Sequence, residues 1–189
     1  LGVAHTKYGD FPIGAILGDQ QSSLFGQGCF VKGLAKATYG TGCFILSNTG
    51  DTPVHNDKML TTIAWTINGN TTYAQEGSIF NAGTVVNWLI DNLQVLESNK
   101  QSSEICSTLT NGTEGVYFVP AFTGMGAPYW SSESTGSIVG LTRGTTKEHI
   151  IRAGLESMAY NTYDIVSSME SENIAIKELR VDGGVTRNE

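Results

Sequence analysis

The chain has 189 residues, 40% of them hydrophobic, and its 18 acidic residues outnumber its 11 Lys and Arg residues, so the formal net charge is −7. This composition is typical of one globular domain with a sizeable buried core. Nucleic acids and anionic membranes bind clustered basic side chains, so neither is favoured as a partner of this acidic chain. We also expect no membrane span, because the sequence has no run of about 18 apolar residues.

The three cysteines, Cys29, Cys43 and Cys106, are widely spaced and form no CxxC pair. An odd count without such a pair argues against a disulfide framework and against a thiolate zinc site. The first residues also lack the charged and apolar regions of a signal peptide. We therefore expect a reducing compartment, the cytoplasm.

The first half of the chain predicts mostly strands. Apolar runs, glycine positions and turn residues indicate these elements: a buried strand at 13–17, a helix at 20–31, a strand pair within 36–47 that bends at Gly40 and Gly42, a turn at 48–51, and a hairpin of 60–67 with 71–75.

The second half predicts two long amphipathic helices and two further strands. The expected elements are a helix at 77–96, a loop with a short helix at 97–114, a strand at 116–119, an aromatic loop at 122–130, a helix from 146 to 166 capped by Thr145 or Thr146, and a strand at 179–181. Strands that lead into glycine-rich loops, with helices between them, are typical of a mixed α/β domain. Such a domain binds its ligand at the loop end of the sheet.

Two local patterns could carry chemistry. The glycines of Gly40-Thr41-Gly42 allow backbone amides to turn toward an oxyanion, although the same tripeptide also suits a purely structural hairpin turn. Asp19 follows an apolar segment, where a catalytic carboxylate would project from the end of the sheet; the alternative is a helix N-cap. The three histidines, His5, His55 and His149, share no spacing suited to a metal site.

Five segments together resemble the FGGY carbohydrate kinases, and among them the glycerol kinases. In chain order these segments are GDQQSSLFGQ at 18–27, TYGTGCF at 38–44, VPAFTGMGAPYW at 119–130, GLTRG at 140–144 and RVDGG at 180–184. The resemblance implies an actin-like, ribonuclease-H-like fold of two domains, with ATP and glycerol between them. Residues 1–189 would form part of the second, C-terminal domain, with the N-terminal domain and the last helices absent. The resemblance further implies that the longer parent protein is a homo-oligomer.

The resemblance also assigns roles to individual residues. Asp19 would be the catalytic base, and Asp19, Gln20 and Phe44 would bind the substrate. The nucleotide would contact Gly40, Thr41, Gly42, Gly83, Asn87, Gly184 and Asn188. Asn87 stands where the family commonly has Gln, so a shorter amide would have to reach the nucleotide. No residue is implied as a metal ligand.

The implied reaction is the ATP-dependent phosphorylation of glycerol to glycerol 3-phosphate, with Mg²⁺ offsetting phosphate charge. Two alternatives stay open: another FGGY sugar kinase, or a truncated nucleotide-binding fragment without catalysis. His5 lies in a loop where some relatives carry a histidine that accepts a regulatory phosphoryl group, and its alternative is an ordinary surface histidine.

Overall fold

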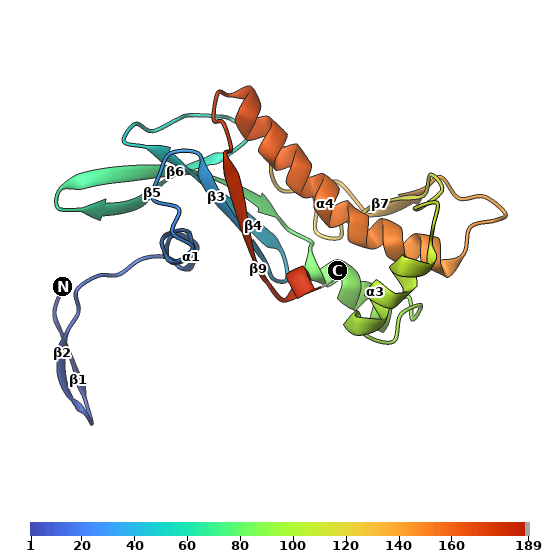
Figure 1. The fold of residues 1–189 in the computed structure, drawn as a ribbon, viewed down its shortest axis with the longest axis horizontal. Coiled ribbons are helices and arrows are strands. Elements are labelled where there is room, and N and C mark those ends of the chain that lie inside the picture. Colours follow the sequence, from blue (N-terminus) through green and yellow to red (C-terminus); the bar gives the residue numbers. More distant parts are fainter. Residues whose placement is uncertain (188–189) are drawn as a thin grey trace.

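The computed structural model describes residues 1–187 and is built around one five-stranded sheet. In spatial order its strands are β5 (Leu60–Ile67), β6 (Asn70–Ile79), β4 (Cys43–Gly50), β3 (Leu34–Tyr39) and β9 (Glu178–Gly183). β3 and β9 are parallel, and the other neighbours are antiparallel. The sheet is therefore mixed, as the sequence predicts (Figure 1).

A helix covers each face of this sheet, because successive residues of a strand point to opposite faces. On β4, Ile45 belongs to the core beneath α4 (Lys147–Ser171), whereas its neighbour Leu46 belongs to a smaller core with Leu24 of α1 (Asp19–Gly26). A Cβ at Gly77 would lie 2.6 Å from Ile165, so α4 packs directly against β6.

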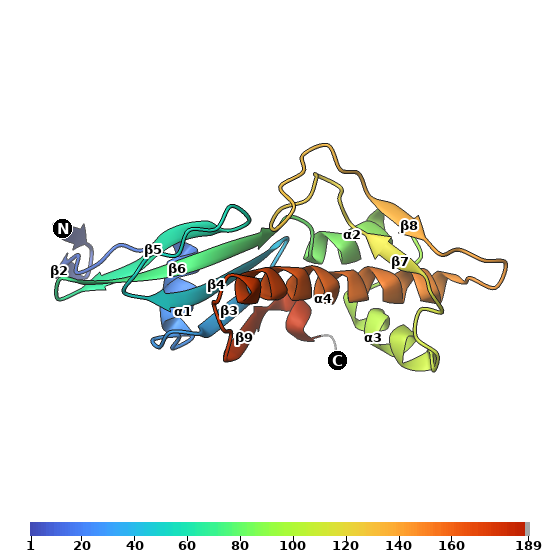
Figure 2. The ribbon, with the colours of Figure 1, turned by 90° about the horizontal axis from the view of Figure 1, so that it is seen from above.

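Helix α4 extends beyond the five-stranded sheet, and four further elements pack around its N-terminal half (Figure 2). They are α2 (Gly83–Asp91), α3 (Asn99–Thr108) and the strand pair β7 (Tyr117–Val119) and β8 (Ser137–Val139). The 3-10 helix η1 (Gly184–Arg187) follows β9. Among residues 1–187, no helix combines the length and the apolar character needed to cross a membrane.

The N-terminal region differs from the prediction. Residues 13–17 form no strand and are mostly exposed, with Ile16 77% exposed. They follow a hairpin that the sequence did not indicate, β1 (Val3–Thr6) with β2 (Gly9–Pro12), which projects from the body (Figure 1). An apolar run without a strand partner or a covering layer has no packing to fix it in the sheet, so the prediction of a buried strand is wrong.

Two predicted helices begin or end at other residues. The helix expected to reach residue 31 ends at Gly26, since Gly28 adopts a left-handed backbone with φ of 70°. Residues 77–79 were expected to open a helix but extend β6, because they pair with β4, and the helix starts only at Gly83. The turn expected at 48–51 also begins too early, because β4 continues to Gly50.

The other predicted elements are confirmed. The strand pair around 36–47, the hairpin after residue 60, the short helix within 97–114 and the strands at 116–119 and 179–181 all form. The long helix after Thr146 also forms, with Thr146 as its N-cap. Its capping box is completed by His149, so this histidine is a buried polar residue with hydrogen-bond partners.

Candidate functional site

The glycine turn between β3 and β4 is joined to the start of α2, some forty residues further along the chain. The Gly40 carbonyl accepts from the Gly83 amide at 3.0 Å, and the Thr41 carbonyl accepts from the amides of Ala82 at 2.9 Å and Thr84 at 3.2 Å. A Cβ at Gly83 would lie 2.6 Å from the Gly40 oxygen, so this close approach requires glycine. The turn therefore has both a structural role and a fixed place beside a helix N-terminus.

A cavity of about 760 Å³ opens beside this turn. It brings together five of the residues predicted to bind nucleotide: Gly40, Thr41, Gly83, Asn87 and Gly184. Gly184 faces open space, since an added Cβ would meet nothing within 4 Å. Gly42 does not line the cavity; a Cβ there would lie 2.4 Å from the Ile79 oxygen. Asn188 lies outside the described residues.

The turn has backbone donors that are free in the described part of the chain, and of these the Thr41 amide belongs to a residue that lines the cavity. The Gly40 amide donates to the Gly42 carbonyl at 2.9 Å, whereas the amides of Thr41 and Gly42 donate to no group in the described part of the chain. Thr41 is exposed, and its hydroxyl makes no hydrogen bond within residues 1–187 either. Successive free amides in a glycine turn suit an anion such as a phosphate.

Sequence reasoning missed the opposite wall of the cavity. Helix α3 contributes Asn99, Lys100 and Glu104 to the lining. Lys100 supplies a positive charge to the lining of this cavity, and Glu104 a negative one. No sequence signal connects a polar stretch around residue 100 with a glycine turn at residue 40, because their proximity results from the packing of α3 on α4.

Asp19 is the first residue of α1, and the N-cap position is taken by Gly18. Its Oδ1 accepts from the Gln20 amide at 2.8 Å, and its Oδ2 lies 3.5 Å from Gln20 Nε2. The alternative that Asp19 is the helix N-cap is therefore wrong, because Gly18 is the N-cap and Asp19 is the next residue. Its carboxylate is exposed at the end of the helix that covers one sheet face.

A buried lysine stands below Asp19 and Gln20. Lys36, on β3, donates to Gln20 Oε1, to Thr38 Oγ1 at 3.1 Å and to the Phe44 carbonyl at 3.2 Å. Burial lowers the pKa of its ammonium, and the nearby carboxylate of Asp182 opposes this shift. Phe44 itself keeps 37% of its surface exposed. The predicted substrate residues Asp19, Gln20 and Phe44 thus meet around Lys36.

The histidines and acidic residues form no metal centre in the described chain, where no group of three His, Cys, Asp or Glu side chains is placed to hold an ion. His5 lies on β1, in the projecting hairpin and apart from the cavity (Figure 1). Its Nδ1 is 2.8 Å from Asp10 Oδ1. His55 is exposed.

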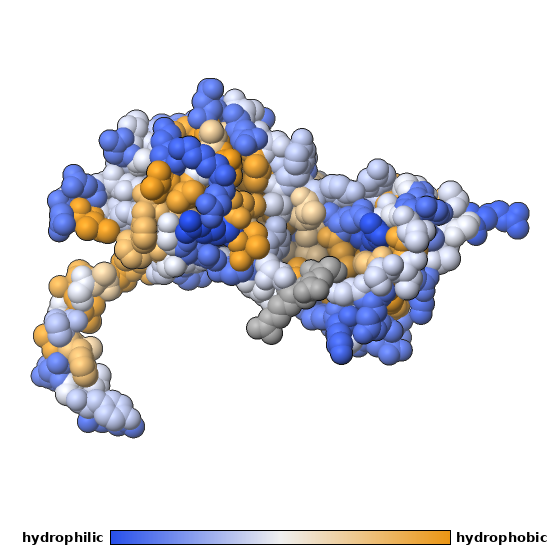
Figure 3. Space-filling view, in the orientation of Figure 1, coloured by the Kyte–Doolittle hydropathy of each residue, from blue (hydrophilic) through white to orange (hydrophobic). Residues whose placement is uncertain are grey.

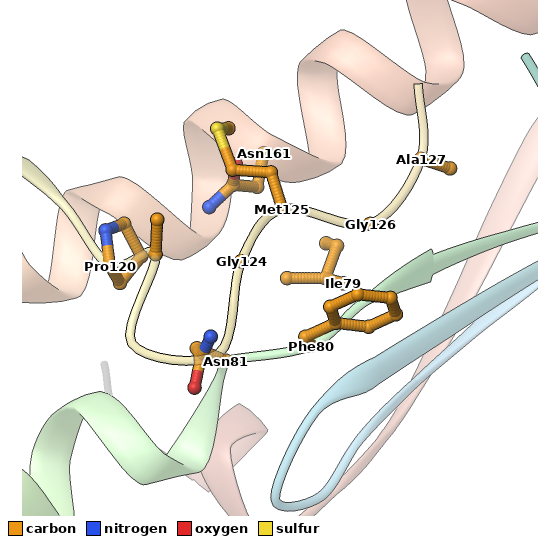
Figure 4. Close-up of a pocket in the computed structure, with 10 residues that line it drawn as sticks. Ile79, Phe80, Asn81, Pro120, Gly124, Met125, Gly126, Ala127 and Asn161 are labelled. Carbon is orange, nitrogen blue, oxygen red and sulfur yellow. The ribbon is translucent and has the colours of Figure 1, made fainter. Parts of the chain in front are cut away.

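The aromatic loop that contributes most to the resemblance has a packing role. It covers a small cavity of about 20 Å³ that is lined from β6, from this loop and from α4 (Figure 4). A Cβ at Gly126 would lie 2.0 Å from the Ser78 oxygen, and the Ala127 amide donates to that same oxygen at 3.0 Å. None of the predicted site residues lines this cavity. The loop therefore fixes the end of β6, next to α2.

The chain is similar to known carbohydrate kinases over most of its length. A family model, the C-terminal domain of the FGGY family of carbohydrate kinases, matches residues 35–189. The glycerol kinase of Desulforamulus reducens is 57% identical over 180 residues, which cover 94% of this chain and 36% of that protein. The crystal structure of Plasmodium falciparum glycerol kinase with ADP has a TM-score of 0.87 at 42% identity, covering 96% of this chain and 37% of that one.

A crystal structure of xylulose kinase from Rhodospirillum rubrum, 22% identical, has a TM-score of 0.77 over 90% of this chain and 34% of its own, and it supports the fold alone. The chain spans little more than a third of the length of the relatives it matches. Its mixed sheet with helices on both faces confirms the predicted actin-like, ribonuclease-H-like fold class. The chain belongs to the FGGY family of carbohydrate kinases.

Proposed function

We propose that this chain is part of the C-terminal domain of a longer kinase, called here the full-length kinase, that phosphorylates glycerol with ATP. In this proposal residues 1–189 supply the catalytic base and part of the nucleotide site. The observation that carries it is the cavity beside the glycine turn, where five residues from three separate segments meet. That cavity lies a few residues along β3 and β4 from the cluster of Asp19, Gln20 and Phe44.

On the nucleotide side, the amides of Thr41 and Gly42 would donate to phosphate oxygens, together with the Thr41 hydroxyl. Phosphoryl transfer needs donors fixed around the moving phosphoryl group more than it needs covalent chemistry from the protein. The bonds from α2 to the turn hold these donors in place before the substrate arrives. Gly83, Asn87 and Gly184 would line the remainder of the nucleotide site, with Asn188 beyond the described residues.

On the acceptor side, Asp19 would take the proton of a glycerol hydroxyl. The hydroxyl oxygen forms a bond to the γ-phosphorus, the bond from that phosphorus to the β,γ-bridging oxygen breaks, and ADP leaves with the electron pair. Gln20 would hold the hydroxyl, and the half-exposed Phe44 ring would contact the carbon chain. A carboxylate suits this role, since its oxygens can accept a proton and need only hydrogen-bond reach.

Mg²⁺ would offset the charge of the phosphates. This ion usually keeps several waters and is ligated by substrate phosphates together with one or two carboxylates, so it would need no all-protein cage. The described residues include no cluster of three His, Cys, Asp or Glu side chains, so phosphate oxygens and waters would be its main ligands here.

The missing partner would be the N-terminal domain of the same polypeptide, with the last helices also outside this chain. Apolar side chains are exposed around α1 and the preceding segment, among them Ile16 and Phe25 (Figure 3). They support the proposal that the N-terminal domain packs against this region. We propose a cytoplasmic location and a homo-oligomeric full-length kinase, in line with the resemblance.

Glycerol is favoured over a pentulose as the acceptor. The glycerol kinase of Desulforamulus reducens is far more similar in sequence than the xylulose kinase, at 57% against 22% identity. We expect the full-length kinase to release ADP with glycerol in a coupled assay, and to do so poorly with xylulose.

Assaying residues 1–189 alone tests the alternative of a nucleotide-binding fragment without catalysis. It should show no turnover with ATP, Mg²⁺ and glycerol, because half of the cleft is absent. A full-length kinase that turns over xylulose and not glycerol, or neither, would overturn the proposed acceptor.

A further inference from the structure

Lys36 is the largest fully buried side chain in the described structure, with no exposed surface. It lies between the sheet and α1, and each group that accepts from its ammonium belongs to the neighbourhood of the proposed substrate site: Gln20 Oε1, Thr38 Oγ1 and the Phe44 carbonyl. Burying an ammonium is costly unless it is paired and hydrogen-bonded. A lysine kept here at that cost calls for a role besides packing.

The contact of Lys36 with Gln20 fixes which way the amide of Gln20 faces. The oxygen and the nitrogen of a glutamine amide are usually told apart only by their hydrogen-bond partners. A lysine ammonium, however, has three donors and no acceptor, so the atom it touches must be the amide oxygen. The amide nitrogen of Gln20 then faces the other way, where it lies 3.5 Å from Asp19 Oδ2.

This orientation determines how a hydroxyl can bind between the two residues. Gln20 presents N–H groups and no carbonyl, so the hydroxyl oxygen accepts from Gln20. Its own proton must then point to an acceptor, and the Asp19 carboxylate is the acceptor beside it. With the amide reversed, the carbonyl of Gln20 would compete with Asp19 for the same proton.

We propose that Lys36 is a positioning residue that sets the amide orientation of Gln20, so that the acceptor hydroxyl is held with its proton directed at Asp19. The proposal rests on the proposed function, since it takes Asp19 as the base. The second bond of Lys36, to Thr38, supports it: Thr38 Oγ1 also lies 3.2 Å from Ser23 Oγ, which links the same lysine to the middle of α1.

The charges that face Lys36 are carried by Asp182 on β9, Glu76 on β6 and Asp19 on α1. None of these three carboxylates forms an ion pair with Lys36. In the described structure, the Lys36 ammonium donates only to neutral oxygens. The lysine is thus held by the groups it orients, whereas the carboxylates offset its charge from a greater distance.

A double-mutant cycle in the full-length kinase tests the proposal, with Lys36→Met, Gln20→Ala and the double variant. Each single variant should lower kcat/KM for glycerol by about tenfold to a hundredfold, the scale of a misplaced reacting group, while KM for ATP stays near that of the wild type. Because Lys36 acts through Gln20, Lys36→Met should add little in the Gln20→Ala background. Lys32→Met, at an exposed lysine four residues earlier, is the matched control and should leave kcat/KM unchanged.

Losses that multiply in the double variant would overturn the role of Lys36 and leave the proposed function intact. A wild-type kinase without activity on glycerol would instead overturn the proposed function, and this inference with it. If Lys36→Met does not fold, neutron diffraction on the wild-type kinase with glycerol decides. The Gln20 amide deuterons must face the glycerol hydroxyl, and an amide turned away from Lys36 or with its oxygen toward glycerol overturns the inference.

Discussion

The Gly40 carbonyl oxygen lies 3.0 Å from the Gly83 amide nitrogen and would lie 2.6 Å from a Cβ on Gly83. Gly40 is in the turn between two strands, and Gly83 is the first residue of a helix 43 positions later. Their contact makes the turn and the helix N-terminus one rigid unit at the mouth of the proposed nucleotide site. Gly83 is therefore needed for packing, whereas a Cβ on Gly40 would have only the Gly42 oxygen within 4 Å, at 3.9 Å.

Replacing Gly83 with Ala should damage this unit. A methyl group at 2.6 Å from a backbone oxygen forces the turn and the helix apart, and overpacking of this kind costs about 1–3 kcal/mol. We expect a lower melting temperature and a higher KM for ATP, with KM for glycerol less affected. Gly144→Ala is the control, because its nearest neighbour would lie at 3.7 Å. A Gly83→Ala protein as stable as the control would contradict the close contact.

Thr41→Ala should separate binding from stability. The Thr41 hydroxyl is exposed and unbonded within the described residues, so its loss should change the free energy of unfolding by less than about 0.5 kcal/mol. A hydrogen bond to a charged phosphate contributes about 1.5–3 kcal/mol, so ATP affinity should fall by roughly tenfold to a hundredfold. Titration calorimetry with a non-hydrolysable ATP analogue measures this, and Thr41→Ser should restore most of the affinity. Unchanged affinity in Thr41→Ala would remove Thr41 from the nucleotide site.

Asp19→Asn in the full-length kinase should lower kcat by about 10²–10⁴-fold, the usual contribution of a general base. Asn keeps the shape and one acceptor oxygen but cannot take the proton. Nucleotide affinity should change little, because Asp19 does not line the cavity beside the glycine turn. Asp19→Glu should also fail, since the longer side chain misplaces the carboxylate. The exposed Asp57→Asn serves as the control, and near-native kcat in Asp19→Asn would leave Asp19 as an ordinary first-turn residue of α1.

The cysteines should react slowly with a thiol reagent in the folded chain. Burial raises the pKa of Cys43 to about 12 and also raises the pKa of Cys29 and Cys106. The thiolate is the reactive form, so a raised pKa slows the reaction at any pH below it. With Ellman's reagent at pH 8, the partly exposed Cys106 should react first, and the other two only on unfolding. Immediate reaction of all three native thiols would contradict the described packing.

His5 should be phosphorylated at Nε2 if it is the regulatory site that the resemblance suggests. Asp10 holds Nδ1 at 2.8 Å, which favours the tautomer with a proton on Nδ1 and a free lone pair on Nε2. Incubation of the full-length kinase with a phosphocarrier system should then give acid-labile phosphate. His5→Ala should abolish that signal, and His55→Ala should not. Label that persists in His5→Ala would assign the modification to another residue.

Local patterns predicted much of the fold, because several helices and strands are determined by residues that are close together in the sequence. The helix after Thr146 is fixed by its cap and its apolar periodicity, and the hairpin after residue 60 by its Asn-Gly turn, where Asn68 and Gly69 both have positive φ. Where the prediction failed, the cause lay elsewhere in the chain. Residues 77–79 have helical periodicity but join β6, since pairing with β4 satisfies their backbone groups.

For the site, the sequence by itself determined the candidate residues: the Asp19-Gln20 pair, the glycine turn and the strand that leads to Gly184. These are recognisable because each motif is contiguous. Tertiary structure alone decided that Lys100 of α3 lines the same cavity as the glycine turn and that Lys36 is buried beside Gln20. Local sequence patterns predict that a lysine is exposed to solvent. Only the closing of α1 over the sheet removes water from Lys36, and it leaves the Gln20 oxygen, Thr38 and the Phe44 carbonyl to accept from its ammonium.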